Sequence, residues 1–158
     1  MIVLRTLAHG VISHAGARYT EWIGMTVLIG LGMAFYFQPG IFEISASFSV
    51  MARWADQATW ANVLLFSGAV RMFALIVNGS FKGFRHSPLL RFMASWIAVM
   101  SMGAISLGMY EAWTTHGGSP TGWIMYGAAG VGLELRNIYV SRLDMGLMKG
   151  RADAGPRK

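Results

Sequence analysis

An arginine interrupts an apolar segment that is long enough to cross a lipid bilayer. The segment runs from Trp60 to Asn78, WANVLLFSGAVRMFALIVN, and Arg71 is its only charged residue. A guanidinium at the centre of a membrane helix costs roughly 2.5–3.5 kcal/mol on insertion scales, so it tends to face other helices and to pair. The sequence therefore predicts a membrane helix whose arginine has a partner elsewhere in the chain.

The composition supports a single membrane domain over residues 1–158. Hydrophobic residues make up 54% and charged residues only 13% of the chain, and the mean hydropathy is +0.47. These values do not suit a soluble domain. The 20 glycines fit helices that pack closely in lipid. The absence of cysteine excludes disulfides and thiolate metal sites.

Four apolar segments predict an all-α, polytopic membrane protein with four transmembrane helices. The expected spans are residues 22–37, 60–78, 92–110 and 123–140. Pro39-Gly40 ends the first span, and Pro88 stands near the start of the third. The loop between the first two spans is expected to lie partly on the membrane, because it carries Phe42, Phe48, Met51 and Trp54.

The distribution of basic residues predicts that both termini are cytoplasmic. Ten lysines and arginines fall on the N-terminal segment, the middle loop and the basic tail (141–158), whereas only Arg53 falls on the other two loops. This topology, with contact to anionic lipids, explains the net charge of +6 without nucleic acid. The basic residues expected to contact lipid headgroups are Arg5, Arg18, Lys82, Arg85, Arg91 and Arg142.

The first 18 residues are predicted to form an interfacial segment. Arg5 and His9 recur at a spacing near four, which is typical of an amphipathic helix lying on the membrane. A solvated N-terminal lead is the alternative, because the apolar face is modest. The segment is too interrupted by charge to match a signal peptide.

Glu134 is the expected partner of Arg71. Arg71 lies roughly 10 Å inside the cytoplasmic end of its span at 1.5 Å per residue, and Glu134 lies at nearly the same depth. An intramembrane pair of these two residues is predicted, on the condition that the second and fourth spans are adjacent. Asn78 and Asn137 are expected to support it, while Arg136 snorkels to headgroups or meets the middle loop. The pair either fixes helix register or belongs to a polar seam lining a water-filled path.

Small residues three or four apart predict close helix packing, within the monomer or between copies. The stripes are Gly30 with Ala34, Ala128 with Gly132, and Ala94 and Ala98 with Ser101. No catalytic residues, metal ligands or cofactor are predicted, because the four histidines are scattered and have no metal-ligand spacing.

The segments RMFALIVNG from Arg71 and PLLR from Pro88, followed by Glu134, Asn137 and Asp144, resemble small four-span membrane proteins of tailed phages. Some members of that group are described as holin-like. The matching positions are Arg71, Asn78, Arg91, Glu134 and Asn137. The resemblance implies a multi-pass protein of the bacterial inner membrane with a non-enzymatic role.

Three functions are consistent with these features, and the first is expected. A holin-like protein would form homo-oligomers and permeabilise the inner membrane. An accessory or scaffold subunit would instead join a larger membrane assembly. A small channel or transporter is third, because no broken helix is evident in the spans.

Overall fold

The computed structural model describes residues 18–80 and 86–153, and all the regular elements in these ranges are helical. In chain order they are α2 (Tyr19–Phe37), α3 (Ile41–Ile44), η2 (Ala46–Phe48), α4 (Ser49–Trp54), α5 (Gln57–Ser80), α6 (Ser87–His116), α7 (Pro120–Trp123), η3 (Ile124–Val131) and α8 (Gly132–Asp153). The side chains of residues 79–80 and 148–153 are not described. The predicted all-α class is confirmed for these residues.

Three helices are long and apolar enough to cross a membrane, which indicates a membrane protein. They comprise Tyr19–Phe37, Gln57–Asn78 and Ser87–His116. The expected fourth span, 123–140, is divided between the π-helical η3 and the more polar α8. Its eight π-helical residues, Ile124–Val131, are apolar but too short to cross alone.

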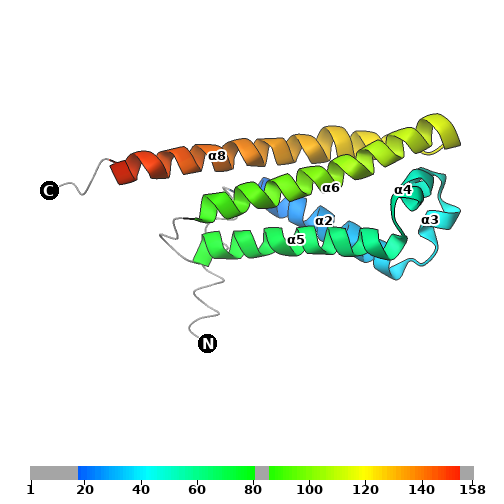
Figure 1. Ribbon diagram of the computed structural model, residues 1–158, viewed down its shortest axis with the longest axis horizontal. Coiled ribbons are helices and arrows are strands. Elements are labelled where there is room, and N and C mark those ends of the chain that lie inside the picture. The colour runs from blue at the N-terminus through cyan, green and yellow to red at the C-terminus, as the bar shows by residue number, and fades with distance from the viewer. Residues whose placement is uncertain (1–17, 81–85, 154–158) are drawn as a thin grey trace.

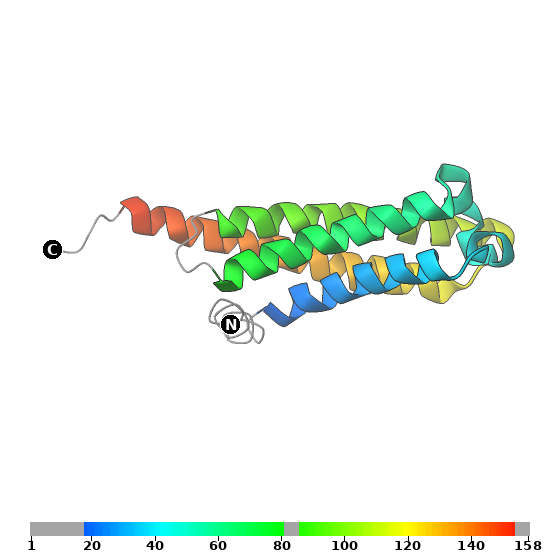
Figure 2. The same cartoon turned by 90° about the horizontal axis from the view of Figure 1, so that it is seen from below.

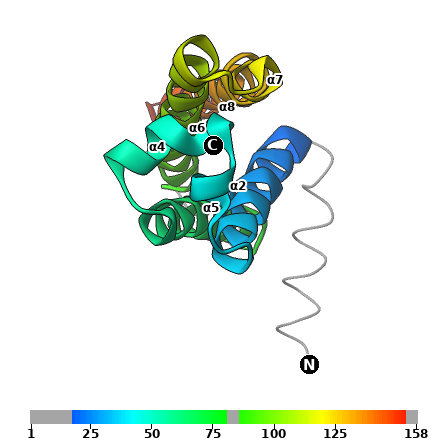
Figure 3. The same cartoon turned by 90° about the vertical axis from the view of Figure 1, so that its right-hand side faces the viewer.

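The long helices form an elongated four-helix bundle (Figure 1). α5 packs against α2 and α6, while α8 packs against α6 and, less extensively, against α2. α5 and α8 therefore lie diagonally opposite each other, as the end view shows (Figure 3). The start of α2 and the end of α8 lie at the same end of the bundle (Figure 2).

Local sequence signals set several helix ends. Gly40, with φ of +75°, follows Pro39 and turns the chain after α2, and Gly117, with φ of +71°, ends α6. Asp56 caps α5, because its Oδ1 accepts a hydrogen bond of 2.7 Å from the Thr59 backbone N–H. Pro88 lies in the first turn of α6, where its missing backbone N–H costs no intrahelical hydrogen bond.

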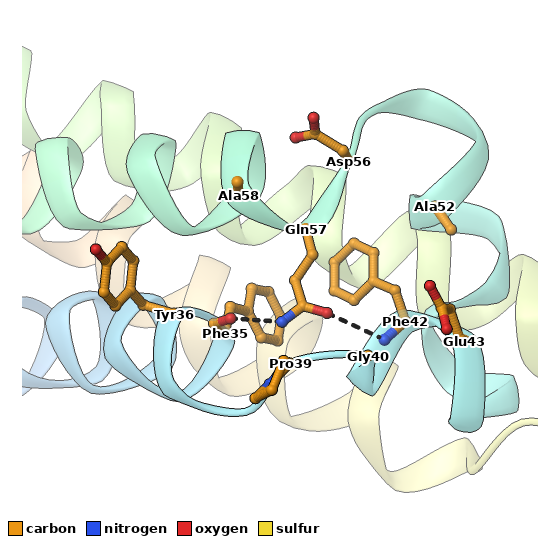
Figure 4. Close-up of a pocket in the computed structure, with 10 residues that line it drawn as sticks. All are labelled: Phe35, Tyr36, Pro39, Gly40, Phe42, Glu43, Ala52, Asp56, Gln57 and Ala58. Carbon is orange, nitrogen blue, oxygen red and sulfur yellow. Dashed lines mark hydrogen bonds between the residues drawn. The ribbon is translucent and has the colours of Figure 1, made fainter.

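Residues 41–54 form short helices that cover one end of the bundle. Phe42 and Met51 are buried, so these side chains pack on the protein instead of lying on the membrane as predicted. Gln57 of α5 ties this cap to α2, since its Oε1 accepts from the Phe42 backbone N–H at 3.4 Å and its Nε2 donates to the Phe35 carbonyl at 2.6 Å (Figure 4). The same Nε2 donates to the Gln38 carbonyl at 2.7 Å. Trp54 is exposed, and its contact with the membrane stays a prediction.

Close helix packing depends on different glycines from those predicted. A Cβ on Gly32 would lie 3.0 Å from the backbone nitrogen of Leu65, so this glycine brings α2 and α5 together. The predicted pairs Gly30/Ala34 and Ala128/Gly132 instead face outward. The stripe on α6 is buried as expected, through Ala94, Ala98 and Ser101.

Candidate functional site

A network of charged side chains is enclosed in the bundle, at the end opposite the cap. It contains three arginines and three carboxylates: Arg18, Arg71, Arg91, Glu21, Glu134 and Asp144. Four of these side chains have residue exposures of at most 3%. With equal numbers of positive and negative charges the network is neutral, which burial requires of ionised groups.

The inner part of the network is the pair of Arg71 and Glu134. Arg71 Nη2 donates to Glu134 Oε2 and also to Ser95 Oγ at 3.0 Å. Asn137 Nδ2 donates to the same carboxylate oxygen at 3.3 Å. The structure therefore brings together the two charged residues that the sequence analysis paired, and it places the predicted Asn137 beside them.

The condition attached to this pairing was wrong, because α5 and α8 are diagonal and not adjacent. The pair spans the interior beside Gly24 of α2, the neighbouring helix. A Cβ on Gly24 would lie 3.2 Å from Arg71 Nη1 and would overlap Glu134 Oε1. The long side chain of Arg71 can reach Glu134 across the bundle because Gly24 of α2, which lies between them, has no side chain in the way.

Gly24→Ala is expected to destabilise the protein by about 1–3 kcal/mol, as added methyl groups do in well-packed interiors. The methyl group would displace a carboxylate that already accepts from two partners. The control is Gly30→Ala in the same helix, where an added Cβ meets no atom within 4 Å. Thermal unfolding of both variants in detergent is the measurement, and equal melting temperatures would contradict the proposed close contact.

The outer part of the network centres on Arg91. Its Nε and Nη2 donate to the two oxygens of Glu21 at 2.9 and 2.5 Å, and its Nη1 donates to Asp144 Oδ2 at 2.8 Å. Arg18 Nη2 donates to the same oxygen of Asp144 at 2.8 Å. This fork geometry is the one in which arginine binds carboxylates most strongly.

Arg91 and Arg18 were predicted to contact lipid headgroups, but both are paired with carboxylates of this chain. Arg91 is 1% exposed, and Arg18 is turned toward Glu21 and Asp144. Glu21 and Asp144 form ion pairs with these two guanidinium groups inside the protein. Arg142 is exposed, and its headgroup contact remains a prediction. Arg5, Lys82, Arg85 and the interfacial segment up to residue 17 lie outside the described residues.

The remaining predicted polar residues connect helix ends. Arg136 Nη1 donates to Thr20 Oγ1 at 3.0 Å, and Thr20 Oγ1 donates to Asn137 Oδ1 at 2.7 Å, which links α8 to α2. Arg136 therefore contacts α2, while residues 81–85 of the middle loop, its other predicted partner, lie outside the described residues. Asn78 does not support Arg71; its Oδ1 accepts from Ser87 Oγ at 2.7 Å and joins α5 to α6.

Sequence reasoning missed Glu21 and gave no role to Asp144. Both lie near those ends of the predicted spans that are expected to be cytoplasmic, among the arginines counted for topology. That count considered basic residues alone. Counting acidic residues on the same side would have shown carboxylates available to Arg18 and Arg91.

Two arginines stabilise the ionised form of Asp144, which lies beyond the expected end of the fourth span. Partial burial by itself raises the pKa of this carboxyl group. The hydrogen bonds and charges of Arg91 and Arg18 together outweigh burial, so the pKa lies below its usual value of 3.8. Asp144 is therefore a charged residue of the folded protein at neutral pH.

Asp144→Asn is expected to lower the melting temperature at neutral pH, by an amount that disappears in acid. Because folding lowers the pKa of Asp144, its contribution is complete above the unfolded pKa and is lost as the pH falls through the folded value. Melting curves of both proteins, taken from neutral pH to below pH 3.8, measure this effect. A difference that stays constant in acid would mean that packing, not charge, is responsible.

The network is suited to holding helices together. Each of its three carboxylates accepts a hydrogen bond from at least one arginine on another helix. Within residues 18–80 and 86–153, no cluster of three potential metal ligands occurs. Two nitrogens of Arg71, Nε and Nη1, have no hydrogen-bond partner in the described part of the chain.

Comparison of the chain with protein-family models, curated proteins and solved structures finds no match. The fold and the site define a helical membrane protein with a neutral charge network in its interior.

Proposed function

We propose that this protein is a non-enzymatic accessory or scaffold subunit of a larger assembly in a bacterial inner membrane. The observation that carries the proposal is the enclosed charge network, to which all four long helices of the bundle contribute residues. Glu21 comes from α2, Arg71 from α5, Arg91 from α6 and Glu134 from α8. A bundle cross-linked in this way is suited to keeping one shape, as a scaffold must.

The proposed topology has four spans and two cytoplasmic termini. Support for the fourth span comes from the uninterrupted helical run of α7, η3 and α8, which packs along α6. The start of α2 and the end of α8 lie at one end of the bundle, as an even number of crossings requires (Figure 1). The charge network then lies near the cytoplasmic face, where the basic tail begins.

The holin-like function is the alternative, and the position of the network makes it the weaker one. A permeabilising oligomer needs a hydrophilic surface to line the lesion. The four buried charges of the network, on Glu21, Arg71, Arg91 and Glu134, face inward, whereas the outer surface carries exposed apolar side chains such as Phe66, Phe73 and Met100. Permeabilisation would require the helices to separate, and a channel or transporter would also require a path through the paired charges.

Labelling of single cysteines tests the topology, because the natural chain has no cysteine. His116→Cys is expected to react with a membrane-impermeant maleimide in intact spheroplasts. Lys82→Cys is expected to react only after the membrane is permeabilised. The reverse pattern would place the termini outside and contradict the proposal.

Two further measurements separate scaffold from holin. Expression at high membrane levels, followed with a membrane-potential dye, is expected to cause no depolarisation. Native mass spectrometry of protein solubilised from its own host membrane is expected to show a hetero-complex. Depolarisation together with a homo-oligomer would favour the holin-like alternative and overturn the scaffold proposal.

A further inference from the structure

A lateral groove separates α2 from α7 and η3, which precede α8 in the chain. α2 packs on α8 near the charge network, and the groove opens further along, beside η3. It has a volume of about 610 Å³, within the range of about 300–1,000 Å³ typical of small-molecule sites. Ile23 and Val27 of α2 form one wall, and Met125 and Ala129 of η3 form the other. Figure 3 shows the helices that flank it.

The lining changes from polar to apolar along the groove. Near the cap it is lined by hydroxyl-bearing residues, Ser45, Ser47, Ser119 and Thr121, and hydrogen bonds join the last three to one another. Toward the charge network it is lined by aliphatic side chains and methionines, ending at Ile23 and Leu133. Gly24 and Glu134 follow these two residues in the sequence, so the apolar end stops beside the Arg71–Glu134 pair. Hydroxyls at one end and hydrocarbon at the other match an amphiphile lying along the bundle axis.

The η3 wall has an unusual backbone. Ile124–Val131 is π-helical over eight residues, whereas π-helices normally occur as single turns and often mark functional sites. Ala129 and Gly130 face the groove from this segment, so small side chains preserve its volume. Substitution of Ala129 or Gly130 by a larger residue would therefore fill the groove.

We infer that this groove binds an acyl chain of a membrane phospholipid, with the glycerol and headgroup region at the hydroxyl end. The groove opens sideways beside α2 and α6, two helices apolar enough to span a membrane. A lipid tail can then enter from the bilayer without crossing water. The polar hydroxyl end distinguishes this occupant from a second copy of the chain, whose outward helix faces are apolar.

Native mass spectrometry in detergent, with added dioleoylphosphatidylglycerol, tests the inference. The natural protein is expected to retain one phospholipid per chain. Ala129→Trp is expected to weaken this binding about ten-fold, because the indole ring occupies the space of the acyl chain. The control is Ala128→Trp at the adjacent, exposed position, which does not line the groove and is expected to bind normally.

A second pair of variants repeats the test from the opposite wall. Val27 and Met33 are both on α2 and both 41% exposed, but only Val27 lines the groove. Val27→Trp is expected to weaken lipid retention about ten-fold, while Met33→Trp leaves it unchanged. Equal retention by both members of each pair would overturn the inference. A groove variant that dissociates a dimer without changing lipid retention would also overturn it, and would assign the groove to a second copy.

Discussion

Replacement of Glu134 by alanine is expected to destabilise the protein by about 3–5 kcal/mol, the usual cost of removing one partner of a buried ion pair. Arg71 would remain 1% exposed with only Ser95 Oγ as a polar partner. Asn137 Nδ2 would lose its carboxylate acceptor at the same time. Thermal unfolding in detergent measures the effect, and each kcal/mol corresponds to about 2–4 °C for a chain of this size.

An exposed ion pair in the same chain provides the control. Arg53 and Glu111 are paired with side-chain exposures of 56% and 45%, so Glu111→Ala is expected to cost no more than about 1 kcal/mol. Comparable losses for Glu111→Ala and Glu134→Ala would show that burial does not determine the effect.

A double replacement separates a structural role from a functional one. Arg71→Met combined with Glu134→Leu is expected to recover most of the stability lost in Glu134→Ala, because no unpaired charge remains buried. If this variant folds and still enters the proposed membrane assembly, the pair serves the fold. If it folds but no longer assembles, the charges themselves are needed for function.

Arg91→Ala is expected to have an effect of similar size, about 3–5 kcal/mol. It removes three donor nitrogens at once and leaves Glu21, which is 3% exposed, with Arg18 at 3.6 Å as its nearest cation. Loss of stability is again measured by thermal unfolding in detergent. A reduced level of the protein in membranes is the expected cellular consequence.

Two other arginine variants define the cause. Arg142→Ala, at an exposed position of α8, is expected to change stability by no more than about 0.5 kcal/mol. Arg91→Lys keeps the charge but cannot reproduce the fork across Glu21 and Asp144, so a loss of about 1.5–3 kcal/mol is expected. Full stability in Arg91→Lys would mean that charge alone, without the fork geometry, accounts for the role of Arg91.

Pairing Arg71 with Glu134 from sequence was feasible because helical rise converts sequence position into depth. Each residue lies a similar distance from the end of an apolar segment, and few other charges are available inside the spans. The assumption that paired helices must be neighbours failed. An arginine side chain is long enough to reach a diagonal helix when the residue between them, here Gly24, has no side chain.

The arginines near the helix ends were harder to assign. Positive charge beside a span satisfies the topology rule whether it contacts lipid headgroups or a carboxylate of another helix. Arg91 and Arg142 therefore look alike in sequence, yet one is buried among carboxylates and the other is exposed. Only the arrangement of helices distinguishes them, because Glu21 and Asp144 are 70 and 53 residues away from Arg91 along the chain.

Small residues present the same difficulty. Spacing by four predicts a stripe on a helix, but not the direction in which that stripe faces. Gly30 meets no neighbour, whereas Gly24 and Gly32, in the same helix, lie at close contacts. The side that faces a neighbouring helix depends on the rotation of α2 about its axis, which is set by packing against α5 and α8.

The amino-acid sequence is sufficient to show that this chain is helical and suited to a membrane, because hydropathy and the need to satisfy the backbone in lipid depend on local residues alone. It also determined that Arg71 requires a carboxylate, since an unpaired charge in hydrocarbon is costly. Tertiary structure decided which charges share the interior, which glycines permit contact and where the lateral groove opens. These features depend on distances between residues remote in sequence, and such distances exist only once the helices have packed.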